Sequence, residues 1–219
     1  MLPKKIIPIA NADKAFHESW KKGRDPLNLP HPFRMICLGP PNSGKTTIVK
    51  NIILRAKPEF DEVVVIHCDS GYTEEYKDIG EVKMMDHIPS PEEWEGEVKT
   101  LCVIDDMELK TLSKDQRRCL DRLFGYVSTH KNISVMLCSQ DAFNVPPIVR
   151  RCSNVWCLWK CNDLVSMATI ASRSGLKLED FKEIFDKFIK EPKDSLWIDR
   201  TDKTPYPLRI NGYTMISEN

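Results

Sequence analysis

One short stretch of the chain has the residue types and spacing to bind the phosphates of a nucleotide. Residues 39–46 read GPPNSGKT, which fits G-x-x-x-x-G-K-[ST], the pattern of a phosphate-binding loop, or P-loop. Gly39 and Gly44 permit backbone conformations that turn successive N–H groups toward one anion. Lys45 adds a positive charge at the β- and γ-phosphates, and the Thr46 hydroxyl is placed to bind Mg²⁺. The stretch therefore predicts that ATP or a similar nucleotide binds with Mg²⁺.

The residues on either side of this stretch have the patterns that a P-loop needs. An apolar run of strand length, 33–38, precedes it, and 47–56 place Ile48, Ile52 and either Ile53 or Leu54 on one helical stripe. A helix that begins at the loop directs its dipole and its first N–H groups at the phosphates. We expect the nucleotide to be bound by Gly39, Pro40, Pro41, Asn42, Ser43, Gly44, Lys45, Thr46 and Thr47.

Two carboxylates follow a second apolar run and are candidates for metal binding and catalysis. Residues 100–104 lead directly into Asp105 and Asp106. Because the carboxyl ends of parallel strands meet the ligand crevice, both acids are expected to face the phosphates. Asp105 is placed to hold Mg²⁺, directly or through water. Asp106 is placed to orient and polarise the attacking water as a general base.

Polar residues at the ends of later runs complete the candidate chemistry. Gln140 follows the strand-like run 132–138 and could sense the γ-phosphate or help to place water. Arg150 and Arg151 keep their positive charge, and each guanidinium can donate two hydrogen bonds to phosphate oxygens. Such side chains suit an arginine finger that reaches the nucleotide of a neighbouring subunit. A surface pair of arginines in a loop is the alternative. His67, at the end of the run 62–66, is expected to be a hydrogen-bonded histidine rather than a functional one.

The elements that must position these residues are strands alternating with helices. We expect amphipathic helix over 113–130, with Leu120, Leu123, Phe124 and Val127 facing inward, and a short helix capped by Ser90. Two further helices, 164–172 and 178–190, are separated by Gly175. The strands are expected at 33–38, 62–67, 101–105, 133–139 and 154–159, with a possible short one at 82–85 and a C-terminal hairpin of 195–199 and 206–210.

This order of elements predicts an α/β fold with a mostly parallel central sheet flanked by helices, plus a small C-terminal β-hairpin. A whole strand lies in sequence between the P-loop strand and the carboxylate strand, as in P-loop NTPases of the additional-strand type with a catalytic acid. We expect residues 1–32 to form an N-terminal extended arm, with a short helix near 13–21. Residues 33–219 are expected to form one ATPase domain, whose C-terminal helices and hairpin begin at about 163.

Composition limits the compartment and the partners. The 32 basic and 32 acidic residues balance, so no overall positive charge indicates nucleic-acid binding, although a ring could still touch DNA with one loop per subunit. Of the eight cysteines, four lie in expected strands, none forms a C-x-x-C pair, and free thiols are typical of a reducing, intracellular compartment. No apolar stretch approaches the ~18 residues of a membrane span. The four strand cysteines are Cys37, Cys102, Cys138 and Cys157.

A combination of these motifs resembles one family. Residues 29–34 (LPHPFR) lead into the P-loop, Asp105 and Asp106 follow an isoleucine, and VPPIVR at 145–150 precedes a strand that contains tryptophan. Together with Ser139 and Gln140, these resemble the genome-packaging ATPases of large DNA viruses, virophages and Polinton-like elements, within the FtsK–HerA superfamily. The resemblance covers about residues 29–160, and the C-terminal helices and hairpin are also similar.

The resemblance implies a motor that couples ATP hydrolysis to the movement of double-stranded DNA into a preformed capsid. It implies a homo-oligomeric ring, a pentamer or hexamer, with active sites between subunits, and capsid or portal-vertex proteins as partners. Lys45, Thr46, Asp105, Asp106 and Gln140 would come from one subunit, and Arg150 or Arg151 from its neighbour. The implied location is the host-cell cytoplasm, a viral factory or the virion. No membrane span is implied.

The sequence departs from the family at one position and leaves some questions open. Many relatives in the wider superfamily have glutamate where this chain has Asp106, so Glu108 is an alternative general base. A DNA helicase or replication ATPase is a second interpretation, but it would need further DNA-binding domains. A nucleotide-dependent assembly protein without hydrolysis is a third. The first candidates for DNA contact are Lys110, Lys114, Arg117 and Arg118.

Overall fold

A computed structural model describes residues 27–69, 71, 74–161, 163–201, 204 and 207–216. Most of the expected N-terminal arm, including its helix near 13–21, lies outside the described residues. The described start of the chain packs onto the domain: Leu29 and Phe33 are buried, and the His31 ring contacts Ser134 and Asn132. Burial, the largest effect, lowers the pKa of His31 to about 4.

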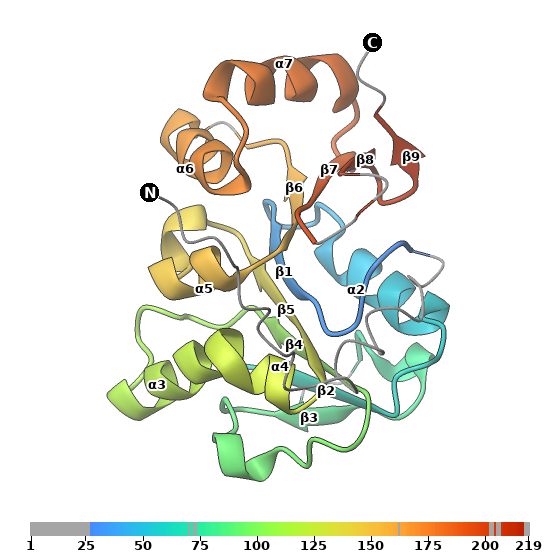
Figure 1. Ribbon diagram of the computed structural model, residues 1–219, viewed down its shortest axis with the longest axis vertical. Helices are drawn as coiled ribbons and strands as arrows, with labels where there is room; N and C mark the ends of the chain where they lie inside the picture. The colour runs from blue at the N-terminus through green and yellow to red at the C-terminus, as the bar shows by residue number, and fades with distance from the viewer. Residues whose placement is uncertain are drawn as a thin grey trace, which may run out of the picture.

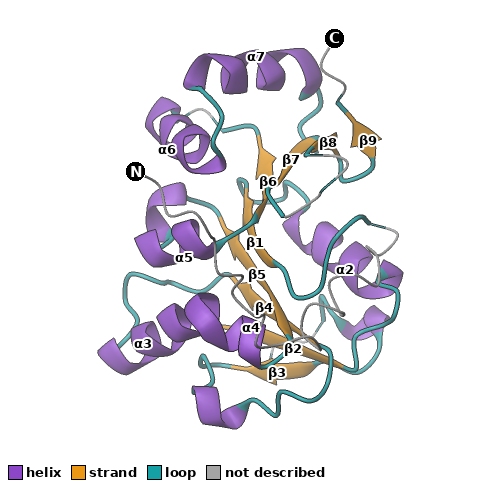
Figure 2. Cartoon of the chain, in the orientation of Figure 1, coloured by secondary structure: helices purple, strands orange, loops and turns teal. Residues whose placement is uncertain are grey.

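A nine-stranded sheet forms the middle of the molecule (Figure 2), in the order β3-β2-β4-β5-β1-β6-β7-β8-β9. The strands from β3 to β6 in this order are parallel, and β7, β8 and β9 are added antiparallel. The five expected strands and the short one near 82–85 are all confirmed. Their bounds are β1 Arg34–Leu38, β2 Glu62–His67, β3 Lys83–Met85, β4 Thr100–Asp105, β5 Ile133–Ser139, β6 Val155–Trp159, β7 Ser195–Asp199, β8 Leu208–Ile210 and β9 Thr214–Met215.

The strand β5 lies between β1 and β4, so the strand that precedes the P-loop and the strand that carries the acids are not neighbours. The separating strand is β5, which follows β4 in the sequence, and not β2, which lies between β1 and β4 in the sequence. The predicted fold class, with an additional strand between the P-loop strand and the acid strand, is confirmed. The carboxyl ends of β1, β4 and β5 lie at the same edge of the sheet because all three strands are parallel. The residues that follow these three strands therefore come together.

Helices cover both faces of the sheet (Figure 1). Helix α2, Lys45–Arg55, packs on one face, where alternate strand residues such as Met35 and Cys37 point. The other face, to which Ile36 and Leu38 point, is covered by the remaining helices. These are α3 Lys114–Arg122, α4 Ser128–His130, α5 Pro147–Cys152, α6 Leu164–Ser174 and α7 Leu178–Phe188.

The expected helix 113–130 is continuous but not regular. Between α3 and α4 the segment Leu123–Val127 has π-helical hydrogen bonding, which the sequence pattern does not predict. The predicted inward residues, Leu120, Leu123, Phe124 and Val127, are all buried. On α2 the stripe is formed by Val49, Ile52 and Ile53, whereas Leu54 is 60% exposed because it lies a further ~100° around the helix.

Most of the expected ends and breaks of the smaller elements are confirmed. Gly175 ends α6 with a left-handed φ of 79°, so it separates α6 from α7 as predicted. Ser90 caps a single 3₁₀ turn, Pro91–Glu93, through reciprocal bonds with Glu93. Two other 3₁₀ turns lie at Lys77–Ile79 and Ala142–Asn144. Over the described ranges, no helix is long and apolar enough to cross a membrane.

The C-terminal hairpin is part of the central sheet and not a separate addition. Strands β7 and β8 are antiparallel as predicted, but β7 also pairs with β6, and β9 adds a further strand. The guanidinium of Arg209 is buried there, 3.5 Å from the Asp199 carboxylate, and donates to the carbonyl oxygens of Leu27 and Gly212. The pairing of β7 with β6 joins distant parts of the chain, so the local hairpin pattern could not reveal it.

Candidate nucleotide-binding site

The P-loop connects β1 to α2, and its two glycines are required for different physical reasons. Gly44 has φ of 109°, in the left-handed region that side chains rarely adopt. Gly39 is required for space, since a Cβ atom there would lie 2.6 Å from the Ser43 hydroxyl oxygen and 2.9 Å from the Trp159 ring. Gly44 thus permits the backbone turn of the loop, and Gly39 permits its close packing against Ser43 and Trp159.

A buried ammonium group occupies the centre of the loop. Lys45 is 8% exposed, and its Nζ donates to the carbonyl oxygens of Gly39 at 2.8 Å and Pro40 at 2.9 Å. The Ser43 hydroxyl is also buried and has no hydrogen-bond partner among the described residues. A loop with a buried cation and an unsatisfied hydroxyl, at the start of an eleven-residue helix, fits a phosphate group.

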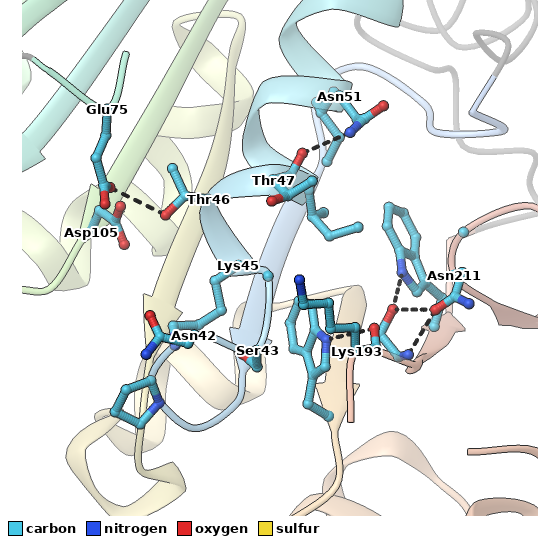
Figure 3. A pocket seen from close by; sticks show the side chains of 18 of the residues that line it. Asn42, Ser43, Lys45, Thr46, Thr47, Asn51, Glu75, Asp105, Lys193 and Asn211 are labelled. Carbon is cyan, nitrogen blue, oxygen red and sulfur yellow. Dashed lines mark hydrogen bonds between the residues drawn. The ribbon is translucent and has the colours of Figure 1, made fainter. Parts of the chain in front are cut away.

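A cavity of about 780 Å³ extends from the loop, within the size range of small-molecule sites. Figure 3 shows the loop and α2 on one side of it, the carboxylates of Glu75 and Asp105 at one end, and the C-terminal strands opposite. The P-loop residues that line it are Pro41, Asn42, Ser43, Gly44, Lys45, Thr46 and Thr47. The opposite wall includes Trp159, Lys193, Trp197, Asn211, Gly212 and Tyr213.

The end of the cavity at which Mg²⁺ is predicted to bind, called the metal end below, contains a buried acid. Asp105, the last residue of β4, is 5% exposed, and its Oδ2 accepts a hydrogen bond of 2.6 Å from the Tyr76 hydroxyl. Burial raises the pKa of Asp105, the Tyr76 hydrogen bond opposes this, and the charges of Asp106 and Glu75 raise it further. Burial and the adjacent Asp105 carboxylate raise the pKa of Tyr76 well above its ordinary value, so the phenol keeps its proton. Asp105 is therefore held as a hydrogen-bond acceptor beside the loop.

The oxygen atoms at this end are the kind that Mg²⁺ prefers. The Thr46 hydroxyl lies 3.4 Å from Glu75 Oε2, and both residues line the cavity with Asp105. A hydroxyl and carboxylates suit a hard cation. Thr46 and Asp105, the two residues that the sequence predicts for Mg²⁺, thus lie at the same end of the cavity, and their role in binding Mg²⁺ stays a prediction.

Asp106 and Gln140 lie together at the mouth of the cavity. Gln140 Nε2 donates to Asp106 Oδ1 at 3.4 Å, and Asp106 is exposed, with a left-handed φ of 49°. Both side chains also line a second cavity of about 340 Å³. Glu108 lines only this second cavity, so Asp106 is the nearer of the two acids to the predicted phosphate position. The catalytic roles of both residues stay predictions.

The two arginines lie away from the site of their own chain. Arg150 and Arg151 are on α5, not in a loop, and neither lines the nucleotide cavity. Arg150 is half-buried and its Nη1 donates to the Ala142 carbonyl oxygen at 3.4 Å, whereas Arg151 is exposed. Their role at a neighbouring subunit stays a prediction, and exposure favours Arg151.

Several residues of the site were not expected from the sequence. Glu75 and Tyr76 lie in a polar stretch without periodicity, and only the position of Tyr76 beside Asp105 identifies them. The wall formed by the C-terminal strands also lacks a local signal. His67 fits its prediction: its Nδ1 accepts a hydrogen bond of 2.9 Å from the Asp69 backbone N–H.

No protein-family model and no curated protein sequence matches this chain. Solved structures do resemble it. The genome packaging NTPase B204 of Sulfolobus turreted icosahedral virus 2, in complex with AMPPCP, has a TM-score of 0.61 and 16% identity, over 82% of this chain and 96% of that chain.

Two other solved structures are also similar. The pCW3 conjugation coupling protein TcpA, with bound ATPγS, has a TM-score of 0.52 and 15% identity, over 79% of this chain and 59% of that chain. The type VII secretion ATPase EccC of Thermomonospora curvata has a TM-score of 0.56 and 12% identity, over 90% of this chain and 28% of that chain. At such identities the likeness concerns the fold. The chain has the fold of the P-loop nucleoside triphosphatases, a fold that it shares with a viral genome-packaging NTPase over nearly that protein's whole length.

Proposed function

We propose that this chain is an ATP-hydrolysing motor that packages double-stranded DNA into a preformed capsid, as a homo-oligomeric ring with active sites between subunits. One observation carries the proposal. The P-loop lysine, the buried Asp105 and the Asp106–Gln140 pair converge on one cavity at the carboxyl edge of the parallel sheet. The match to B204 supports the packaging role, because it extends over 96% of that genome packaging NTPase.

Each residue of the site has a chemical task in this proposal. Lys45 binds the β- and γ-phosphates once its ammonium leaves the loop carbonyls. Thr46 and Asp105 hold Mg²⁺, which neutralises charge on the phosphates when bound. Asp106, exposed to water at the mouth of the cavity, accepts the proton of the attacking water. Because Gln140 donates to Asp106 Oδ1, it fixes the carboxylate and leaves Oδ2 to take that proton.

The proposal extends to the partners and the compartment. Arg151, or Arg150, reaches the phosphates of the neighbouring subunit as an arginine finger. Double-stranded DNA is the track, and capsid or portal-vertex proteins hold the ring. The chain works in the host-cell cytoplasm or a viral factory, or with the virion, a reducing setting that suits its eight cysteines.

The test is ATP turnover with and without double-stranded DNA, in wild type and in Asp106→Asn. We expect duplex DNA to stimulate wild-type turnover, and Asp106→Asn to lower it by about 10²–10⁴-fold while ATP still binds. Glu108→Gln is the matched control and should retain activity. Loss of activity in Glu108→Gln with retention in Asp106→Asn would reverse the assignment of the general base.

Other outcomes would replace the proposed function. Turnover that is the same with any nucleic acid would remove DNA as the track. Stimulation by single-stranded DNA with strand separation would favour a helicase. ATP binding without turnover would favour an assembly protein.

A further inference from the structure

The segment that follows β2 brings two side chains to the metal end of the cavity from outside the P-loop and the acid strand. Glu75 and Tyr76 precede the 3₁₀ turn Lys77–Ile79, which packs near α2. The Tyr76 side chain is buried, and the Glu75 side chain is exposed on the cavity wall. Each contacts a different residue of the predicted Mg²⁺ site.

Tyr76 controls the orientation of Asp105. Its side chain is 3% exposed in the core between the sheet and α2, so the ring has a fixed position. Its hydroxyl donates to Asp105 Oδ2 at 2.6 Å, a distance typical of a strong hydrogen bond to a carboxylate. This bond occupies one carboxylate oxygen and leaves the other for a metal ion. A phenylalanine would fill the same space without orienting the acid.

Glu75 adds negative charge at the same end of the cavity as Asp105. Its Oε2 lies 3.4 Å from the Thr46 hydroxyl, and the two side chains are adjacent in Figure 3. Three acids, Glu75, Asp105 and Asp106, thus line the cavity with the ammonium group of Lys45. Such a set of charges repels metal-free ATP and attracts a divalent cation.

We propose that Tyr76 is a positioning residue for Asp105 and that Glu75 is a further carboxylate of the metal end, so that together they make nucleotide binding depend on Mg²⁺. This inference rests on the proposed ATP site. It differs from a purely structural role, because a core tyrosine and a surface glutamate would affect stability without changing the linkage between metal and nucleotide.

The experiment measures the affinity for AMPPCP by calorimetry, once with Mg²⁺ and once with EDTA. The dissociation constant in EDTA divided by the dissociation constant with Mg²⁺ reports how strongly Mg²⁺ assists binding. We expect Tyr76→Phe to reduce this ratio about tenfold, by weakening binding only when Mg²⁺ is present. We expect Glu75→Gln to reduce it by a similar factor and also to tighten binding in EDTA, because one repulsive charge is removed.

Matched control variants are available for both positions. Glu74→Gln changes the neighbouring exposed acid, which pairs with Lys77, and Tyr126→Phe changes a tyrosine that is 46% exposed on the opposite side of the sheet. Neither should change the ratio. Thermal unfolding of each variant separates a stability effect from a binding effect, and Glu75 is exposed enough to test the idea even if Tyr76→Phe lowers stability.

Two results have different meanings. If Glu75→Gln and Tyr76→Phe give the same ratio as their controls while wild type binds AMPPCP with Mg²⁺, the inference is overturned and the proposed function stands. If wild type binds no nucleotide with or without Mg²⁺, the proposed function itself fails.

Discussion

At the residue scale, the two P-loop glycines differ in what a methyl group would disturb. Gly39→Ala places a Cβ against Ser43 and Trp159, so we expect it to cost about 1–3 kcal/mol of unfolding free energy. Gly44→Ala meets nothing within 4 Å but must hold φ near 109°, so we expect about 1–2 kcal/mol of backbone strain. Both variants should also weaken binding of ATP analogues.

Urea unfolding and calorimetry measure these two effects. The control is Gly125→Ala, in the π-helical segment, where a Cβ meets nothing within 4 Å and φ is not positive. This variant should be neutral or more stable by up to about 1 kcal/mol. Equal stability of Gly39→Ala and Gly125→Ala would contradict the close packing of the loop against Trp159.

Also at the residue scale, His31 should make stability depend on pH. Its pKa is lowered to about 4 by burial, so the folded state favours the neutral ring. In the unfolded chain the His31 ring has a pKa of about 6.5, so below that pH the unfolded state binds a proton that the folded state does not. The free energy of unfolding is therefore highest above about pH 6.5 and decreases as the pH falls toward about 4. We expect up to about 2 kcal/mol to be lost between pH 7 and pH 5.

The difference between wild type and His31→Gln isolates this effect in urea titrations across that range. The variant should lack the slope. His87→Gln is the control with the opposite sign, because hydrogen bonding to Asp86 raises the pKa of this exposed histidine and it stabilises the fold at low pH. If His31→Gln loses unfolding free energy between pH 7 and pH 5 as wild type does, the pH dependence belongs to other groups.

At the element scale, the buried Arg209–Asp199 pair attaches β7 and β8 to the rest of the sheet. Both side chains are at most 1% exposed, and Arg209 also holds the carbonyl oxygens of Leu27 and Gly212. We expect Arg209→Met to cost about 3–5 kcal/mol of unfolding free energy, because it leaves the acid buried without this partner. Nucleotide affinity should fall too, since Leu27 and Gly212 line the cavity.

The comparison for this pair is Lys57→Met, which removes an ion pair between exposed side chains, Lys57 and Glu59. That change should cost no more than about 1 kcal/mol in the same urea experiment. The double variant Arg209→Met with Asp199→Leu should recover part of the stability lost in the single one. A cost for Arg209→Met as small as that for Lys57→Met would contradict the structural role of the buried pair.

At the scale of the whole molecule, the charges balance, so the proposed DNA binding must depend on a local set of cations. Lys114 and Arg118 are exposed on α3, on the face of the sheet opposite α2 (Figure 2), whereas Arg117 donates to the carbonyl oxygens of Leu109 and Lys110. Substituting Lys114→Gln and Arg118→Gln together should weaken duplex binding and lower the slope of log K against log salt by about two.

Fluorescence anisotropy with duplex DNA at several salt concentrations measures that slope. The paired control is Lys182→Gln with Lys187→Gln, which removes two exposed charges from α7. An unchanged slope in the α3 variant would exclude this surface from DNA contact, and a reduced slope in the α7 variant would place the contact there instead.

The sequence predicts those structural features that depend on residues close together in the chain. The P-loop residues 39–46 and the acids 105 and 106 lie at the ends of runs such as 33–38 and 100–104, and buried parallel strands read as continuous apolar segments. The inward face of the helix 113–130 follows from its periodicity. The π-helical segment within this helix cannot be predicted in the same way, because the periodicity of apolar residues does not specify to which carbonyl oxygen each N–H donates.

By itself, therefore, the sequence determined the loop that fits phosphate, the two carboxylates and the strands that place them, because each depends on local backbone chemistry and burial. Only the tertiary structure decided that β5 separates β1 from β4, that the hairpin joins the sheet, and that Tyr76 reaches Asp105. These contacts join residues as far apart as Leu27 and Arg209, 182 positions along the chain. They depend on how complete elements pack, and no local pattern of residues contains that information.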